Sequence, residues 1–437
     1  MLELLVPLEL LESPLPLPTM KVLLVNTSDH AGGAAIAALR LLKALRQSDI
    51  EATLLCRDRS LPESRADVVS LKSSVRLKVK FVLERAEIYA ANGFSRKGLF
   101  AVDTARYGTD ITRLPEFQEA DVIHLHWVNQ AMLSMKGIRR ILQSGKRVVW
   151  TMHDMWPFTS ICHHAADCEK WLTECHDCPC LLRPSAHDFS YRTFREKQRV
   201  YGLSEQPTFV GCSQWLTELA QQSPLLKGHR VVSIPNPIDT AFYAPPADKA
   251  AMRQALHLPA DKHLLLFTAF KVTNPDKGIA YLKESLDLLC KERPELAERL
   301  ALVVAGQEAE VAREQMPIPT YAFGYDTSED RQRSLYQASD LLLMPTLMDN
   351  LPNTIVEAMA CGIPCVGFRI GGLPQMIETG VNGYLAQYRS SADFARGIAS
   401  VITSPSYTAL CRNARTKAVA AYSEKAVAEA YNSIYKY

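Results

Sequence analysis

The chain has 437 residues, of which 47% are hydrophobic and 22% are charged, a composition that excludes a disordered or fibrous protein. At roughly 150 residues per domain, this length predicts two to three domains. Lys plus Arg number 49 and Asp plus Glu 47, so the formal net charge of +2 gives no indication of a nucleic-acid partner.

The segment 1–19 is apolar but is interrupted by Glu3, Glu9, Glu12 and four prolines. It lacks the basic start of a signal peptide and the roughly 20 uninterrupted apolar residues of a membrane span. We interpret 1–19 as a disordered or extraneous extension and expect the fold to begin at Met20. No other apolar run of about 18 residues occurs, so we expect a cytoplasmic protein without a membrane span.

From Met20 onward, short apolar runs alternate with stretches of helical periodicity. The runs predict parallel strands buried on both faces, in two series: 21–27, 52–58, 121–127, 147–154 and 208–213, then 263–270, 300–306, 320–325, 341–346 and 364–368. Helices are predicted at 34–47, 130–144, 214–223, 279–293, 353–361 and 391–403. This alternation predicts an α/β fold of two tandem Rossmann-like, doubly wound domains that face a cleft.

The series of runs is interrupted at 236–262, where prolines cluster, and we expect an inter-domain linker there. The linker separates an N-terminal domain at 20–235 from a C-terminal domain at 263–415. The last segment, 416–437, is predicted to form a helix that packs back on the body. Its apolar residues recur at helical spacing: Ala426, Val427, Ala430, Tyr431 and Ile434.

Ligands bind beyond the carboxyl ends of parallel strands, so the residues that follow each strand are the candidates for function. After the run 21–27, Gly32 and Gly33 precede a helical stretch. Paired glycines let backbone N–H groups approach an anion at a helix start, although the same turn can also serve packing alone. The pattern is not GxGxxG, so a nicotinamide cofactor is not indicated.

The most informative stretch, LMDNLPNTIVEAMACGIP, follows the fourth run of the second series. Pro352 suits the first turn of a helix, which leaves the backbone N–H groups of Asn350 and Leu351 for an anion. Asp349 and Glu357 flank this helix start, where both can accept hydrogen bonds from hydroxyls of one elongated ligand. The alternative is that Asp349 caps the helix and Glu357 faces solvent.

Two lysines follow the run 263–270. Lys271 comes directly after it, and Lys277 precedes a glycine and a predicted helix. At the mouth of the second sheet they can neutralise a pyrophosphate as point charges, with a solvated loop pair as the alternative.

Together these segments resemble the retaining glycosyltransferases of group 1 or family 4, which have the two-domain GT-B architecture. The resemblance extends over the chain from about Met20 onward. It rests on Asp349-x7-Glu357, Gly371-Gly372, Lys271 with Lys277-Gly278, and the crossing Ile234-Pro235-Asn236-Pro237-Ile238-Asp239. The HLHW, TMHDMWPFT and cysteine-rich segments are similar to a branch that builds bacterial surface polysaccharides.

The resemblance implies three catalytic side chains. His153 would hydrogen-bond the sugar near the scissile bond, Asp349 would contact sugar hydroxyls, and Glu357 would bind the ribose. Donor binding near the diphosphate is implied for Gly32, Gly33, Lys271, Lys277, Asn350 and Leu351. Two positions depart from the family pattern, because Asp349 is one methylene shorter than the usual Glu and Lys271 replaces an Arg.

We therefore expect a metal-independent, retaining glycosyltransferase of the hexosyltransferase type. It would move a sugar from a nucleotide-diphosphate sugar to a surface glycan on a lipid-linked acceptor, in exopolysaccharide, capsule or lipopolysaccharide synthesis. The chain contains no Asp-x-Asp pair to hold Mg²⁺, so no cofactor is expected for catalysis. Two alternatives are a hydrolysing nucleotide-sugar epimerase and a non-catalytic scaffold subunit that binds nucleotide-sugar.

Five of the eleven cysteines fall within 162–180. Cys175-x2-Cys178 has the spacing of a zinc knuckle, and Cys162 and Cys168 supply a second pair. We expect a structural zinc ion in this insert, with reduced thiols or a labile disulfide as alternatives.

A basic segment lies at 72–100, where seven Lys and Arg residues oppose two Glu residues. Apolar side chains are interleaved among them. This pattern predicts a surface that rests on anionic lipid at the inner membrane face, with an ordinary solvated helix as the alternative.

Overall fold

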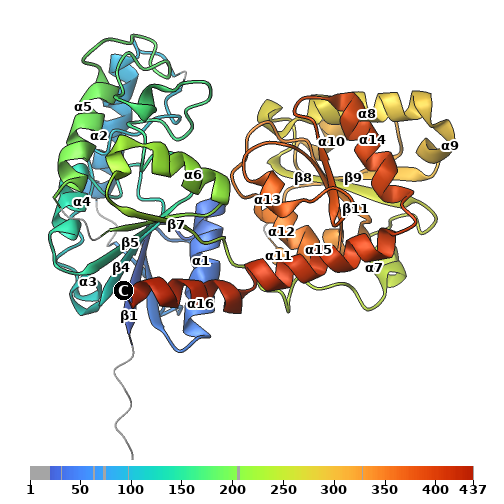
Figure 1. The fold of residues 1–437 in the computed structure, drawn as a ribbon, viewed down its shortest axis with the longest axis horizontal. Coiled ribbons are helices and arrows are strands. Elements are labelled where there is room, and N and C mark those ends of the chain that lie inside the picture. The colour runs from blue at the N-terminus through green and yellow to red at the C-terminus, as the bar shows by residue number, and fades with distance from the viewer. Residues whose placement is uncertain are drawn as a thin grey trace, which may run out of the picture.

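The computed structural model describes residues 20–30, 32–62, 64–71, 75–96, 98–203, 207–326 and 328–436. The chain forms two lobes, each built on a parallel sheet flanked by helices (Figure 1). The predicted extension at 1–19 lies outside the described residues, as do Lys72 and Lys97 of the basic segment. The expectation of two tandem Rossmann-like domains is confirmed.

The first lobe runs from β1 to β7 and contains a seven-stranded sheet in the order β3-β2-β1-β4-β5-β6-β7. Its strands are β1 Lys21–Ser28, β2 Glu51–Asp58, β3 Val68–Ser70, β4 Val122–Leu125, β5 Arg147–Met152, β6 Thr208–Gly211 and β7 Arg230–Ser233. Its helices are α1 Gly33–Arg46, α2 Val75–Ala91, α3 Pro115–Glu119, α4 Met135–Leu142, α5 Phe189–Tyr201 and α6 Gln214–Gln222.

The second lobe runs from α7 to α15 around a six-stranded sheet in the order β10-β9-β8-β11-β12-β13. Its strands are β8 His263–Lys271, β9 Leu300–Gln307, β10 Thr320–Phe323, β11 Leu341–Met344, β12 Cys365–Phe368 and β13 Gly383–Ala386. Its helices are α7 Lys249–Ala255, α8 Ile279–Glu292, α9 Pro294–Ala297, α10 Ala309–Arg313, α11 Glu329–Ala338, α12 Asn353–Ala360, α13 Leu373–Met376, α14 Ser391–Ile402 and α15 Tyr407–Tyr422.

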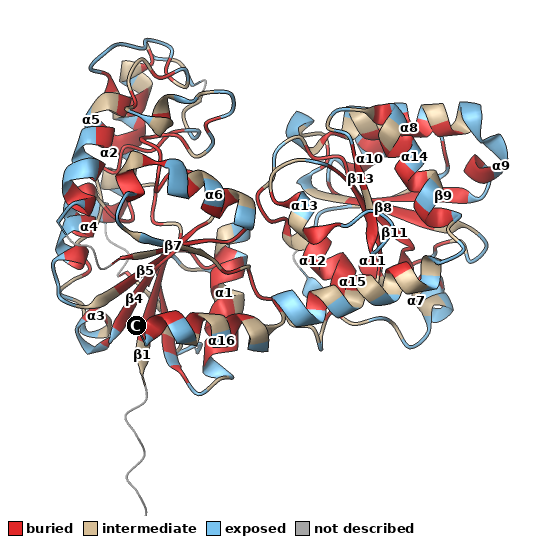
Figure 2. Ribbon diagram, viewed as in Figure 1, coloured by how far each residue is buried: buried red, intermediate tan, exposed pale blue. Residues whose placement is uncertain are grey.

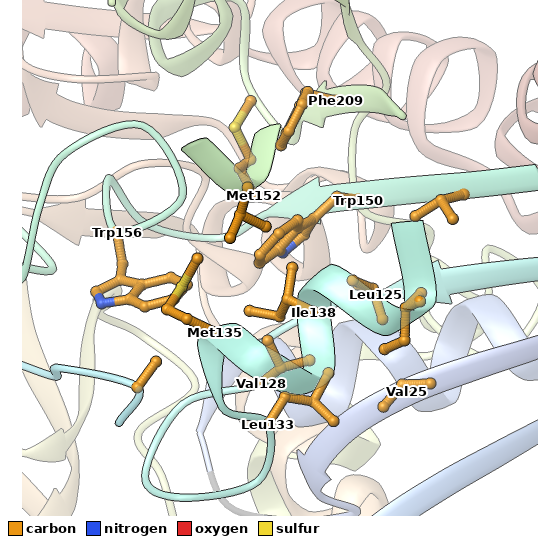
Figure 3. Packing of buried hydrophobic residues seen from close by; sticks show 14 of the residues in the cluster. Val25, Leu125, Val128, Leu133, Met135, Ile138, Trp150, Met152, Trp156 and Phe209 are labelled. Atoms are coloured by element: carbon orange, nitrogen blue, oxygen red, sulfur yellow. The ribbon is translucent and has the colours of Figure 1, made fainter. Parts of the chain in front are cut away.

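The strands form the buried centre of each lobe and the helices carry the exposed surface (Figure 2). In the first lobe, Trp150 on β5 stacks on Phe209 of β6 at a centroid distance of 5.8 Å (Figure 3). The ring centroid of Trp156 lies 6.2 Å from that of Trp150. The indole Nε1 of Trp150 donates a hydrogen bond to the carbonyl oxygen of His126 at 3.1 Å. The core thus fixes the segment that follows β4, on the edge of the sheet where function is expected.

The chain passes between the lobes twice. The first passage follows β7, and the second joins α15 to α16, Glu424–Tyr435, with a parallel bridge between Ile238 and Ser423. Helix α16 lies against α1 and the first sheet, so the last helix of the chain belongs to the first lobe (Figure 1). In the described part of the chain, no helix combines the length and apolarity needed to cross a bilayer.

Candidate active site

A cleft of about 900 Å³ lies between the lobes and receives residues from the carboxyl ends of both sheets. It opens beside β1 and β4 and beside β8 and β11, where the strand order of each sheet reverses. Such reversals are the usual ligand sites of doubly wound sheets. Eight of the predicted site residues line this cleft: Gly32, Gly33, His153, Lys277, Asp349, Asn350, Leu351 and Glu357.

Two helix starts face each other across the cleft. A Cβ atom placed on Gly33, at the start of α1, would lie 4.0 Å from Nδ2 of Asn353 at the start of α12. Neither helix has an acidic residue in its first turn. Unpaired N–H groups and the positive end of the helix dipole make such positions favourable for anions.

Lys277 supplies a positive charge beside these helix starts. Its Nζ lies 3.0 Å from Oδ2 of Asp349, and both side chains are partly exposed. A short 3₁₀ turn places it, followed by Gly278 at a φ of 74°. A Cβ atom on Gly278 would lie 1.8 Å from the carbonyl oxygen of Pro345, so only glycine fits there. The lysine is therefore held at the mouth of the second sheet.

The diglycine at 371–372 supports the loop that carries Asp349 and Asn350. A Cβ atom on Gly371 would lie 1.9 Å from the carbonyl oxygen of Asp349, and one on Gly372 equally close to that of Asn350. Any larger residue would displace the loop from the cleft.

Glu357 is only 5% exposed, which excludes the alternative that it faces solvent. Its Oε2 accepts a hydrogen bond from the hydroxyl of Tyr336 at 2.7 Å, and its Oε1 accepts one from Nη2 of Arg40 at 2.7 Å. Asp349 does not cap α12, because the N-cap position is Pro352 and has no side-chain hydrogen bond.

Asn350 joins the two lobes at the cleft. Its Nδ2 donates to the carbonyl oxygen of His153 at 3.2 Å and lies 2.9 Å from Sγ of Cys212. Its Oδ1 accepts a hydrogen bond from the hydroxyl of Ser213. The loop before α12 is thereby fixed to the ends of β5 and β6.

His153 follows β5 and is neutral at physiological pH, because burial lowers its pKa to about 4 despite the nearby Asp154 carboxylate. Its Nε2 lies 3.0 Å from Nδ1 of His126. The rings of His124, His126 and His153 form a row, with centroid distances of 4.3 and 5.3 Å. A neutral imidazole in the cleft can hydrogen-bond a hydroxyl without repelling or attracting charge.

Asp154 connects the cysteine-rich insert to the cleft. Its Oδ2 accepts from Nε1 of Trp127 at 2.9 Å and lies 2.7 Å from Nδ1 of His163. Burial acts to raise the pKa of Asp154, but the charge and hydrogen bond of His163, together with the backbone N–H of Trp156, outweigh it, so the pKa is lowered. Because Trp127 and Asp154 line the cleft, the position of the insert is coupled to the shape of the site.

Lys271 is the one predicted donor residue that does not line the cleft. The pairing of β8 with β9 is irregular between Thr268 and Lys271, and Nζ of Lys271 lies 2.9 Å from Oε1 of Glu308. The ammonium of Lys271 therefore neutralises a neighbouring carboxylate outside the cleft, and the structure adds no support for its predicted contact with the donor.

The predicted zinc ligands lie together in the segment between β5 and α5. Cys162, Cys168, Cys175 and Cys178 surround a void of about 10 Å³. All eleven cysteines carry free thiols, so the structure has no disulfide in this insert. As the side chains stand, no group of three or more His, Cys, Asp or Glu residues in the described ranges is spaced to hold a metal ion.

Other residues in or beside the cleft were not predicted from the sequence. Arg40 is one polar residue in an otherwise ordinary amphipathic helix, and Tyr336 precedes a strand rather than following one. Trp127 belongs to the HLHW segment, whose place after β4 could have indicated it. Residues whose partners come from another lobe cannot be found from local patterns.

Family models describe most of the chain. The model of Glycosyltransferase Family 4 matches residues 31–242, and that of Glycosyl transferases group 1 matches residues 248–418. The chain belongs to the group 1 and family 4 glycosyltransferases. The resemblance seen in the sequence is confirmed.

Among curated relatives, WcaC of Escherichia coli K12, named as a colanic acid biosynthesis glycosyl transferase, is 24% identical over 255 residues. That match covers 56% of this chain and 59% of WcaC. The D-inositol 3-phosphate glycosyltransferase of Saccharomonospora viridis is 31% identical over 186 residues, 40% of this chain and 42% of the relative. The chain thus spans about half the length of the curated relatives it matches.

Solved structures share the two-lobed GT-B fold. HepE of Anabaena, solved in complex with UDP, has a TM-score of 0.61 at 17% identity and covers 95% of this chain and 99% of its own. Sucrose-phosphate synthase of Thermosynechococcus elongatus has a TM-score of 0.65 at 16% identity, covering 95% and 98%.

Proposed function

We propose that this glycosyltransferase moves a hexose, with retention of anomeric configuration, from a nucleoside-diphosphate sugar to a bacterial surface glycan on a lipid-linked acceptor. The observation that carries the proposal is the convergence of two helix starts, Lys277 and the buried Glu357 in one cleft. The helix starts and the ammonium suit a diphosphate, and the carboxylate suits the two hydroxyls of a ribose.

The comparisons support the donor and the pathway class at the level of analogy. HepE has been solved with UDP and with UDP-glucose, which supports a nucleotide-sugar donor. The name of WcaC supports a surface polysaccharide as the product.

In the proposed reaction, the bond from the anomeric carbon to the diphosphate oxygen breaks and a bond to the acceptor oxygen forms on the same face of the sugar. Negative charge develops on the leaving diphosphate, where Lys277 and the N–H groups at the starts of α1 and α12 stabilise it. A leaving phosphate oxygen takes the acceptor proton. His153 orients the sugar as a neutral hydrogen-bonding partner. These groups supply the positive charge, so the proposal includes no catalytic metal.

Helix α2 supports contact with an anionic membrane on the cytoplasmic face. It buries the charged residues Glu84 and Arg85, and the guanidinium of Arg85 lies 3.1 Å from Oδ2 of Asp103. Leu77 and Ile88 are buried as well, but other apolar residues of the helix are exposed, as are Arg76 and Lys78. The exposed apolar residues are Val75, Val79, Val82 and Leu83. Apolar side chains flanked by cations are the usual contact surface for anionic lipid.

The activity is tested by incubating the full chain with a panel of UDP-, GDP- and ADP-sugars, with and without a lipid-linked glycan extract. We expect release of nucleoside diphosphate that requires the extract and persists in the presence of a chelator. Release without an acceptor would instead indicate a hydrolysing epimerase, and binding without release a scaffold subunit. Loss of activity in chelator that Mg²⁺ restores would contradict the metal-free reaction.

The membrane contact is tested by sedimentation with phosphatidylglycerol vesicles and with phosphatidylcholine vesicles. We expect binding to the anionic vesicles only, and its loss in a Val79→Ser, Val82→Ser double variant. The control is Val419→Ser, which alters an exposed valine on α15 in the other lobe. Equal loss in the control, or no binding by the unaltered chain, would contradict the lipid contact.

A further inference from the structure

The ribose-binding carboxylate of the second lobe is completed by a residue of the first lobe. Arg40 lies on α1, and its Nη2 donates to Oε1 of Glu357 on α12 at 2.7 Å. Both side chains are largely buried, with exposed fractions of 11% and 6%. A buried carboxylate requires a partner of this kind, because removing a charge from water is costly unless it is paired.

The guanidinium does not occupy the space of the ligand. Glu357 and Tyr336 line the cleft, whereas Arg40 does not. An ionised carboxylate offers about four acceptor positions, of which Arg40 and Tyr336 take one each. Acceptor capacity therefore remains for two ribose hydroxyls while both protein partners stay in place.

The inter-lobe passage holds Arg40 in position. The guanidinium carbon lies 5.4 Å from the ring centroid of Tyr243, and Nη2 lies 3.4 Å from its hydroxyl. Tyr243 follows β7 in the first passage between the lobes, and its carbonyl oxygen accepts a hydrogen bond from Arg415 of α15 at 2.7 Å. Any change in the angle between the lobes would move Arg40 relative to Glu357.

We propose that Arg40 is a positioning residue for the donor site, so that the ribose-binding carboxylate is complete only while the two lobes hold this arrangement. The inference rests on the proposed role of Glu357. It follows that nucleotide binding and lobe arrangement are linked: a nucleotide favours the paired arrangement, and loss of the pair weakens nucleotide binding.

The same helix offers a matched control. Lys43, three residues after Arg40 on α1, also bridges to the inter-lobe passages through Asp239 and Glu424 but does not touch Glu357. A variant of Lys43 therefore removes a bridging cation from α1 without altering the ribose site.

The experiment measures binding of UDP, GDP, uridine and guanosine by calorimetry to the full chain and to Arg40→Gln, Arg40→Lys and Lys43→Gln. We expect Arg40→Gln to weaken nucleoside and nucleoside-diphosphate binding by the same factor, about tenfold, because the ribose contact is common to both. Arg40→Lys should recover part of the loss, and Lys43→Gln should bind like the unaltered chain. In solution scattering, the nucleotide should narrow the distance distribution of the unaltered chain more than that of Arg40→Gln.

The outcomes separate this inference from the proposed function. If the unaltered chain binds neither diphosphate, the donor-site proposal fails and the inference with it. If it binds but Arg40→Gln binds equally well, Arg40 has no positioning role. If Arg40→Gln weakens nucleotide binding as much in a Glu357→Gln background as in the unaltered chain, the inference is also overturned, because Arg40 would then act through a group other than Glu357. If Arg40→Gln does not fold, nucleotide affinity is compared in the same way for Arg40→Lys, alone and in the Glu357→Gln background.

Discussion

In the cleft, Lys277 is paired with Asp349 at 3.0 Å, so under the proposed function an incoming diphosphate would compete with that carboxylate for the ammonium. We expect Lys277→Gln to weaken binding of a nucleoside diphosphate about tenfold, the range of a lost charge-assisted hydrogen bond, and to leave nucleoside binding unchanged. Calorimetry with UDP and uridine, or GDP and guanosine, measures the difference.

Lys271 provides the control for this prediction, because its ammonium lies against Glu308 outside the cleft. Lys271→Gln should leave both affinities as they are. If the two variants weaken diphosphate binding equally, positive charge at the mouth of the sheet acts at long range. That result would contradict a specific contact between Lys277 and the diphosphate.

The buried histidines make stability depend on pH. Burial lowers the pKa of His124 to about 3 and that of His153 to about 4, and it lowers the pKa of His126 as well. In the unfolded chain each would titrate near 6.5. Between pH 6.5 and 4 the unfolded chain therefore binds more protons, so the free energy of unfolding falls as pH falls. The slope approaches about 1.4 kcal/mol per pH unit for each histidine.

Urea unfolding between pH 7.5 and 5 measures this dependence. We expect His124→Gln to flatten the slope below pH 6.5, whereas His187→Gln, at an exposed position, should not. A slope that is the same in both variants would show that other groups dominate the acid response.

Local spacing and the family resemblance were sufficient to predict eight residues that line the cleft. Asp349, Asn350 and Glu357 follow a buried strand, and parallel strands bring such residues to one edge. Lys271 also follows a strand, but it does not line the cleft. The pairing of β8 with β9 is irregular just before it, and no residue type in the sequence indicates such an irregularity. Arg40 could not be predicted, because its partner lies on a helix of the other lobe.

At the scale of elements, the buried central strands follow continuous apolar runs and were predicted. The edge strand β7 is only partly buried and was missed, because it has no continuous apolar face. The predicted helix at 130–144 is shorter than expected, since α4 begins at Met135. Gln130 and Ala131 adopt positive φ angles of 54° and 61°, which a helix cannot contain, and the Ser134 hydroxyl caps the helix instead.

The cysteine-rich insert allows a direct test of metal binding. Four cysteines line one small void, and rotation about a single bond repositions a thiol, so the zinc site stays a prediction that metal analysis can decide. We expect about one zinc per chain in the purified protein, with Zn–S distances near 2.3 Å by X-ray absorption.

Two variants test whether Cys175 is a zinc ligand. Cys175→Ser should lose the metal and lower the melting temperature. Cys290→Ser, at a free cysteine on α8 in the other lobe, should retain zinc. A metal-free protein in which the four thiols react freely and activity is complete would reject the site, leaving reduced thiols as the alternative.

At the scale of the whole molecule, α16 is part of the first lobe although it follows the second. Its Tyr431 hydroxyl lies 2.7 Å from Oγ1 of Thr151, and its Tyr435 hydroxyl lies 2.6 Å from Nδ1 of His124. Val427, Tyr431, Ile434 and Tyr435 are all buried. Each such side chain stabilises the fold by about 1.5–3 kcal/mol, so their sum is comparable to the roughly 5–15 kcal/mol that stabilises a domain.

Ending the chain at Ser423 should therefore unfold the first lobe and leave the second folded. Calorimetry should then show one of the two thermal unfolding transitions, and limited proteolysis should degrade the first lobe while the second resists. Ending the chain at Tyr435 keeps α16 and should change neither transition. Loss of both transitions in the shorter chain would mean that the second lobe depends on the first for its own stability.

The return of α16 also sets an order for biosynthesis. The strands and helices of the first lobe emerge from the ribosome well before the second lobe, yet the face of the sheet that α16 covers stays open until the helix has been made. Domains generally fold as units in the order of synthesis, and exposed apolar surface in a waiting domain invites aggregation. The lobe that is translated first is thus completed only after the second lobe has been made, when Tyr431 and Tyr435 cover its sheet.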